Sequence, residues 1–143
     1  MRYLTISLAL FLVLPACSKK ADPADAVRAL IKQCEEHANN GDHAGLTAAL
    51  AADYRDAEGR DRDAVAKRAG RHLKRHSKRF VHARPLSINV SGETAQAAVI
   101  VALAGKRIGP KDDLLKVSAD LIKLKLKLRN KDGAGWLVVS ALW

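Results

Sequence analysis

The stretch that decides the fold is Ile122-Lys123-Leu124-Lys125-Leu126-Lys127-Leu128-Arg129. Large aliphatic residues alternate with basic residues along it without a break. Successive side chains of a β-strand point to opposite faces, so this pattern gives one apolar face and one basic face. The sequence therefore predicts a strand that packs one face on a core and exposes the other to solvent.

The neighbouring sequence predicts further antiparallel strands. They are expected at Leu86–Val90, Thr94–Ala104 and Trp136–Trp143. The segment Thr94–Ala104 is apolar at both parities, so we expect both of its faces to be covered. Turn residues at Ser91-Gly92-Glu93 and at Asn130–Gly135 separate consecutive strands. The expected sheet therefore has four consecutive antiparallel strands, of which the last three form a meander.

Upstream of the strands, the apolar residues have helical spacing. Three helices are expected: Pro23–Ala38, a shorter one that follows Asp42, and one over about Arg62–Phe80. Aspartate is a favoured N-cap and proline a favoured first helical residue, which fits Asp22-Pro23 and Asp61. Helices followed by antiparallel strands predict an α+β domain with its helices on one face of the sheet.

This order of elements resembles a known superfamily. The matching features are the N-terminal helix pair, the loop Asp53-Tyr54-Arg55-Asp56…Gly59, the helix after Asp61, and Gly135-Trp136-Leu137-Val138-Val139 with Trp143. Over about residues 24–143 they resemble the nuclear transport factor 2-like superfamily. The resemblance implies helices packed in a strongly curved antiparallel sheet, a cone with an internal pocket. It does not imply one function, because the superfamily contains ketosteroid isomerase and other enzymes beside non-catalytic binding domains.

The N-terminus carries a second pattern. Leu14-Pro15-Ala16-Cys17 resembles the lipobox of bacterial lipoproteins and follows Arg2 and an apolar run, Leu4–Leu14. As a helix that run spans roughly 16 Å, against about 30 Å of bilayer hydrocarbon, which suits a signal peptide better than a transmembrane span. The resemblance implies that Cys17 becomes the acylated N-terminus. An ordinary signal peptide with a chance cysteine is the alternative.

The lipobox interpretation divides the chain into three parts. We expect a signal peptide at 1–16, a lipidated tether at 17–23 and the folded domain at 24–143. About five residues of tether reach at most roughly 17 Å, so the domain would lie against the lipid surface. The expected location is the cell envelope, facing the periplasm. Ser18 is not the aspartate that retains enterobacterial lipoproteins at the inner membrane, which favours the outer membrane.

The chain is strongly basic, with a formal net charge of +10 at pH 7. Such a charge favours anionic lipid or an acidic partner. The exported location and an aromatic content of 4% argue against nucleic acid, which is bound through aromatic stacking when single-stranded. The candidates for contact with an anionic surface lie in the third helical segment: Arg71, Lys74, Arg75 and Lys78. The alternative is a basic face that only keeps the protein soluble.

Two residues are candidates for pocket chemistry. Asp120 opens the last-but-one strand at the parity of its apolar residues, so its carboxylate could reach the pocket mouth and act as a base. Tyr54 could supply a hydroxyl. The alternatives are a solvated strand end for Asp120 and a loop anchor for Tyr54.

No metal or cofactor is expected. His72 and His76 share a helix face, but basic neighbours would repel a divalent cation. The acidic residues between Asp53 and Asp63 are interleaved with arginines and lack the spacing of a calcium loop, so ion pairs and a helix cap are expected there. Cys34 lies on an apolar helical stripe, which favours a buried small apolar residue.

Taken together, these features predict a membrane-anchored, periplasm-facing lipoprotein whose domain is a non-catalytic binding or assembly module. One alternative is a small pocket enzyme of isomerase, dehydratase or hydrolase type. Another is a structural lipoprotein that forms homodimers through its sheet. The contents of the pocket discriminate between the first two, because an enzyme needs convergent polar groups at the centre of the cone.

Overall fold

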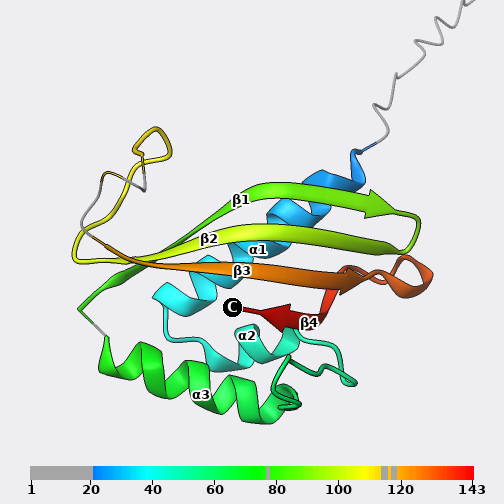
Figure 1. Ribbon diagram of the computed structural model, residues 1–143, viewed down its shortest axis with the longest axis horizontal. Helices are drawn as coiled ribbons and strands as arrows, with labels where there is room; N and C mark the ends of the chain where they lie inside the picture. Colours follow the sequence, from blue (N-terminus) through cyan, green and yellow to red (C-terminus); the bar gives the residue numbers. More distant parts are fainter. Residues whose placement is uncertain (1–20, 77, 114–115, 117–118) are drawn as a thin grey trace, which may run out of the picture.

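The structure is a computed structural model that describes residues 21–76, 78–113, 116 and 119–143. Its helices are α1 (Pro23–Asn39), α2 (His43–Ala48) and α3 (Arg62–Arg75). Its strands are β1 (Phe80–Ser91), β2 (Thr94–Ala104), β3 (Ala119–Arg129) and β4 (Leu137–Leu142). The strands form one antiparallel sheet in the order β1-β2-β3-β4 (Figure 1). The predicted α+β class is therefore confirmed.

Each α-helix begins at the aspartate that the sequence predicts. The side chains of Asp22, Asp42 and Asp61 accept hydrogen bonds from the backbone N–H groups of Ala24, Gly45 and Ala64, each at 2.9 Å. These bonds satisfy donors that have no partner within the helix, which fixes where each helix starts. Among the described residues, none of the helices is long and apolar enough to cross a membrane.

The predicted end of the third helix and start of the first strand are wrong. Helix α3 ends at Arg75, and Phe80, which the sequence pattern places in the helix, is the first residue of β1. Phe80 pairs with Ala104 of β2, and the Arg107 guanidinium lies 4.9 Å from the centre of its ring. The stabilisation from pairing β1 with β2 is thus larger than the preference of the preceding basic residues for a helix. Lys78 consequently lies beyond the helix.

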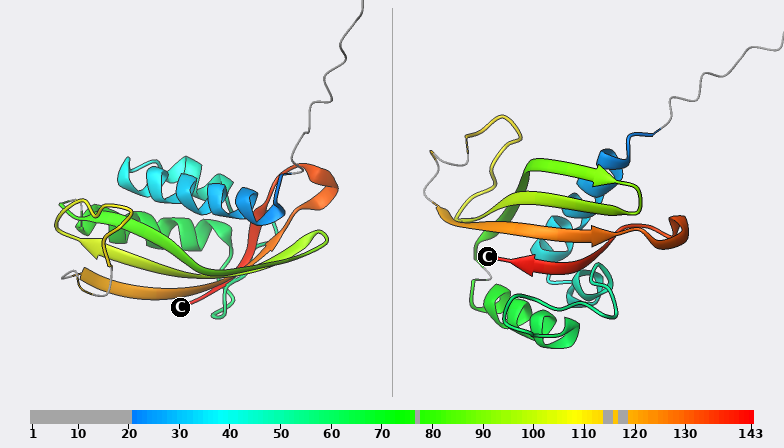
Figure 2. Two further views of the ribbon diagram at one scale, coloured as in Figure 1. Left: turned by 90° about the horizontal axis from the view of Figure 1, so that it is seen from above. Right: turned by 45° about the vertical axis from the view of Figure 1, so that its right-hand side comes forward.

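The helices lie on one side of the curved sheet (Figure 2). The core between them is formed by buried side chains from both layers: Val27, Ile31, Tyr54, Ala95, Ala97, Val99, Leu128, Trp136, Val138 and Ala141. Most of these strand residues occur at alternate positions, as the strand pattern predicts. The apolar face of β3 therefore points toward the helices, and its lysines are exposed.

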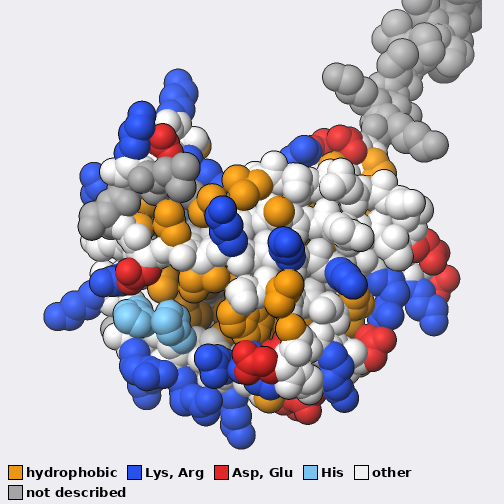
Figure 3. All heavy atoms as spheres, in the orientation of Figure 1, with side chains coloured by type: hydrophobic (Ala, Val, Ile, Leu, Met, Phe, Trp, Pro, Cys, Tyr) orange, Lys and Arg blue, Asp and Glu red, His pale blue; other side chains and the backbone are white. Residues whose placement is uncertain are grey.

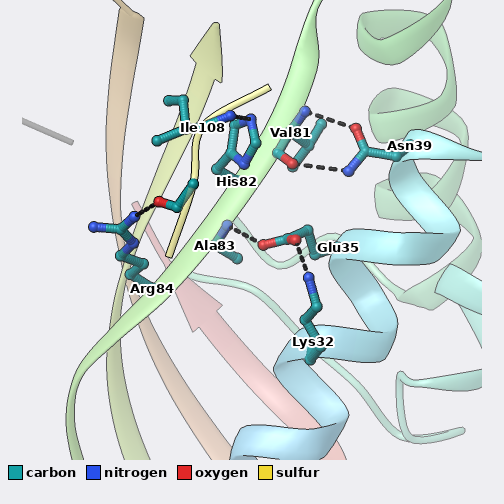
Figure 4. A network of polar contacts seen from close by, with 9 residues as sticks. Lys32, Glu35, Asn39, Val81, His82, Ala83, Arg84 and Ile108 are labelled. Atoms are coloured by element: carbon teal, nitrogen blue, oxygen red, sulfur yellow. Dashed lines mark hydrogen bonds and ion pairs between the residues drawn. The ribbon is translucent and has the colours of Figure 1, made fainter. Parts of the chain in front are cut away.

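Side chains of α1 bind the free edge of β1 (Figure 4). The amide of Asn39 donates to the carbonyl of Val81 and accepts from its N–H, both at 2.8 Å. The N–H of Ala83 donates to Glu35 at 2.7 Å, and Lys32 pairs with the same carboxylate at 2.5 Å. These bonds replace a neighbouring strand, and they fix α1 across the inside of the sheet.

The second face of β2 is covered only toward its C-terminal end. Ile100 and Ala102 are buried there and pack against Ile108 of the following loop. Arg84 of β1 holds that loop by donating to the carbonyl of Gly109 at 2.6 Å. At the other end Gln96 is exposed, so the predicted double coverage holds for half of the strand.

The acidic loop before α3 is an ion-pair cluster, as predicted. The buried carboxylate of Asp56 accepts from the Arg60 guanidinium at 2.6 Å and from the N–H groups of Glu58 and Arg60 at 2.9 and 2.8 Å. Burial acts to raise the pKa of Asp56, but these hydrogen bonds outweigh it and hold the pKa below its ordinary value. Asp53 pairs with Arg129 of β3 at 2.8 Å. The loop is thereby joined to the sheet.

A candidate apolar binding cavity

A cavity of about 280 Å³ lies between the helices and the concave face of the sheet. Its walls come from every helix and strand named above: Leu30, Ile31, Cys34, Glu35, Ala38, Leu46, Ala69, His72, Leu73, Val81, Ala83, Val99, Val101, Leu103, Ile122, Leu124, Leu126, Leu128 and Val138. Nearly all of these side chains are aliphatic. The interior of the cone is therefore hollow and apolar.

The cavity opens between α3 and β3. Along β3, the inward-facing side chains become more exposed toward its N-terminal end, from Leu128 at 2% to Ile122 at 37%. Leu124 and Leu126, between them, are half-buried. Figure 3 shows hydrophobic side chains lining a hollow on this face of the molecule. A ligand would enter here and would reach the core at Leu128.

Glu35 is the acidic residue in the cavity wall, and its role is structural. One of its oxygens accepts from Ala83 and the other pairs with Lys32. Both oxygens are therefore engaged in holding α1 to β1 (Figure 4). A carboxylate bound in this way is poorly placed to act as a general base.

His72 is the most distinctive polar residue of the wall. Its Nε2 atom is buried and has no hydrogen-bond partner among the described residues. Burial, and then the positive charges of His76, Arg75 and Arg68, lower the pKa of His72. The imidazole is therefore neutral at pH 7 and offers a hydrogen bond to a ligand at the opening.

Cys34 contributes a free thiol to the wall. It is half-buried, and burial raises the pKa of the thiol above its ordinary value. The thiolate is the nucleophilic form, so the protonated thiol acts here as a small apolar group. This agrees with the helical stripe on which the sequence places it.

The two residues predicted for pocket chemistry are not among the described residues that line the cavity. Asp120 has the inward parity, but it is exposed and pairs with Arg79 at the end of the sheet. Tyr54 is fully buried within the core, and its hydroxyl has no partner among the described residues. Burial raises the pKa of Tyr54 to about 12. Asp120 is therefore not part of the described cavity wall, although its negative charge acts on His72 in that wall and partly offsets the lowering of the His72 pKa.

The four basic residues predicted to contact an anionic surface do not all lie at the same place. Arg71 and Arg75 line a groove beside the cavity, whereas Lys74 and Lys78 are exposed away from it. The rings of His72 and His76 lie 4.5 Å apart. Within the described part of the chain, no group of three or more potential metal ligands occurs. Cys17, the predicted lipidation site, lies outside the described residues.

Several solved structures share this architecture. An NTF-2 like protein of unknown function from Shewanella oneidensis MR-1 has a TM-score of 0.63 at 18% identity, over 84% of this chain and 97% of its own. A putative ketosteroid isomerase from Shewanella frigidimarina NCIMB 400 has a TM-score of 0.59 at 19% identity, over 81% and 92%. An NTF2-like protein with a cystatin-like fold from Novosphingobium aromaticivorans has a TM-score of 0.61 at 20% identity, over 82% and 78%.

No family model matches the chain, and no curated protein matches it. At this level of identity, the similarity to solved structures concerns the fold and not the activity. The curved four-stranded sheet with helices on its concave face matches the fold of those structures. The chain therefore has the nuclear transport factor 2-like fold.

Proposed function

We propose that this protein is a lipid-anchored component of the bacterial cell envelope whose domain binds an apolar ligand without transforming it. The single observation that carries the binding role is the apolar cavity between the sheet and the helices. The anchor is proposed from the lipobox-like sequence at Cys17. The short tether would hold the domain near the membrane, with Lys74 and Lys78 as candidates for contact with anionic lipid.

The size and chemistry of the cavity support binding. At about 280 Å³ it approaches the volume of typical ligand sites. An engineered apolar cavity of about 150 Å³ stays dry and binds benzene, so a larger apolar cavity has room for a longer hydrocarbon. Each buried methylene contributes about 0.8 kcal/mol. An aliphatic chain would therefore gain most of its affinity from contact with these walls.

The polar groups of the wall support binding rather than catalysis. Glu35 is held by Lys32 and by the backbone of β1. His72 is a neutral imidazole whose buried Nε2 has no hydrogen-bond partner among the described residues. General acid–base catalysis needs convergent groups with matched protonation states at the reacting centre. The cavity supplies shape and apolar surface instead.

Substitution of Leu124 by tryptophan tests the proposed site. Leu124 is half-buried on β3 and lies in the cavity wall, so an indole there would fill the space a ligand needs. We expect Leu124→Trp to weaken the binding of 1-decanol by about tenfold or more. Isothermal titration calorimetry on the unlipidated mature chain, residues 17–143 with Cys17→Ser, would measure this.

The matched control is Lys125→Trp, which places the same side chain one residue away on the exposed face of the strand. It should leave decanol binding unchanged. Thermal melting should show that both variants are folded. Equal decanol affinities for Leu124→Trp and the parent chain would exclude the cavity as the binding site.

A further inference from the structure

We infer that the ligand is a single-chain amphiphile with an anionic head group, whose alkyl chain fills the cavity while its head group lies against Arg68, Arg71 and Arg75. This inference rests on the proposed function and specifies the class of ligand. It is carried by a groove that continues from the cavity, by the charges along that groove, and by an unpartnered polar atom where the two meet.

The groove lies between α3 and β3 and has a volume of about 480 Å³. It shares Ala69, His72, Ile122 and Leu124 with the wall of the apolar cavity. The two spaces are therefore adjoining parts of one hollow, one lined mainly by aliphatic side chains, the other also by arginines. A ligand that occupies both must be apolar at one end.

The outer wall of the groove is basic. Arg68, Arg71 and Arg75 line it at helical spacings that place them along one side of α3. None of these three forms an ion pair with a described acidic residue, whereas Arg79 and Arg129 each pair with an aspartate. Figure 3 shows Lys and Arg side chains gathered beside the apolar hollow, with histidine at its rim. The groove therefore has uncompensated positive charge.

These charges match an anionic head group. A guanidinium binds carboxylate or phosphate oxygens through paired hydrogen bonds, and such charge-assisted bonds are stronger than neutral ones. Three neighbouring cations also repel one another, and a bound anion relieves that repulsion. His72 lies where the groove and the cavity meet, and its buried Nε2 lacks a partner among the described residues. It can hydrogen-bond to the polar end of the ligand.

The geometry separates ligand binding from attraction to a membrane surface. Lys67 and Lys74 also belong to α3 and, like the three arginines, are exposed, but they do not line the groove. An anionic bilayer would be sensed by all the exposed basic residues of the helix. A head group in the groove would form ion pairs mainly with the three arginines.

The test compares 1-decanol, decanoate and decyltrimethylammonium on the unlipidated mature chain, below their micelle concentrations. We expect decanoate to bind about tenfold more tightly than decanol, and the cationic amphiphile to bind most weakly. Affinity should rise about fourfold for each added methylene from octanoate to decanoate, because the chain enters the cavity. Binding of decanol and decanoate with equal affinity would overturn the inference and leave the proposed function standing. Failure of both to bind would overturn both.

Paired variants locate the head group. Arg68→Gln/Arg71→Gln/Arg75→Gln removes the groove charges, and Lys67→Gln/Lys74→Gln removes outward charges from the same helix. The triple variant should lose about tenfold in decanoate affinity and keep its decanol affinity, while the double variant keeps both. Retained decanol binding shows that the triple variant is folded. Equal losses of decanoate affinity in the two variants would assign the effect to diffuse surface charge and overturn the inference.

Discussion

Replacing Leu128 with lysine is expected to unfold the domain. Leu128 is only 2% exposed and packs in the core between the helices and the sheet. In the ladder it lies between Ala95 of β2 and Val138 of β4, so a lysine side chain there would have no route to water along the sheet. An unpaired buried charge costs several kcal/mol, a large part of a typical stability of about 5–15 kcal/mol. Circular dichroism should show no cooperative thermal transition.

Lys127→Leu is the matched control, because it changes the neighbouring residue on the exposed face of the same strand. It should leave the protein folded, with a melting temperature close to that of the parent chain. The contrast depends on the orientation of β3. If the two variants melted at the same temperature, the assignment of the inward and outward faces of this strand would be incorrect.

The second large effect concerns the anchor. Cys17→Ser is expected to move the protein from the membrane fraction to the soluble fraction, because it removes the thiol that the lipobox resemblance marks for acylation. One acyl chain gives only marginal membrane binding, whereas the several chains of a lipoprotein make release negligible. Cell fractionation followed by immunoblotting would measure the change.

Cys34→Ser provides the control for the anchor. It makes the same substitution at the other cysteine, which lies half-buried in the cavity wall. This variant should stay with the membrane. Intact-mass analysis of the parent protein is the complementary measurement, since a mature N-terminus without acyl chains would show that the proposed anchor does not exist.

The fold was predictable where a local pattern determines it. The alternation that ends at Leu128 and Arg129 predicts the orientation of β3, and Asp22, Asp42 and Asp61 predict the helix starts. The end of α3 was not predictable in this way. Its basic residues favour a helix that continues toward Phe80. The chain instead becomes a strand at Phe80, because β1 pairs with β2 along its whole length. A distant strand cannot be read from local propensity.

The resemblance implies an internal pocket, but the residues of its wall could not be predicted because they come from many elements. Leu126 and Leu128 have the same parity and the same chemistry and both line the cavity, yet the first is half-buried and the second is almost fully buried. Parity also gives no position along the strand relative to the cavity, so it does not show that Asp120 pairs with Arg79 and does not line the described wall. The one feature of the sequence that points to a polar group in this wall is Glu35, a carboxylate beside the apolar stripe of α1. Its partners on β1 lie far away in the sequence.

The central claim is that the cone binds an apolar chain, and methyl NMR of the chain titrated with 1-decanol tests it most directly. Methyl resonances of Leu30, Val101 and Leu124, which line the cavity, should shift with decanol concentration. Those of Val27, buried in the core, and Leu86, exposed on β1, should stay in place because neither lines the cavity. Shifts confined to surface residues such as Leu86, or no shifts at all, would contradict the account.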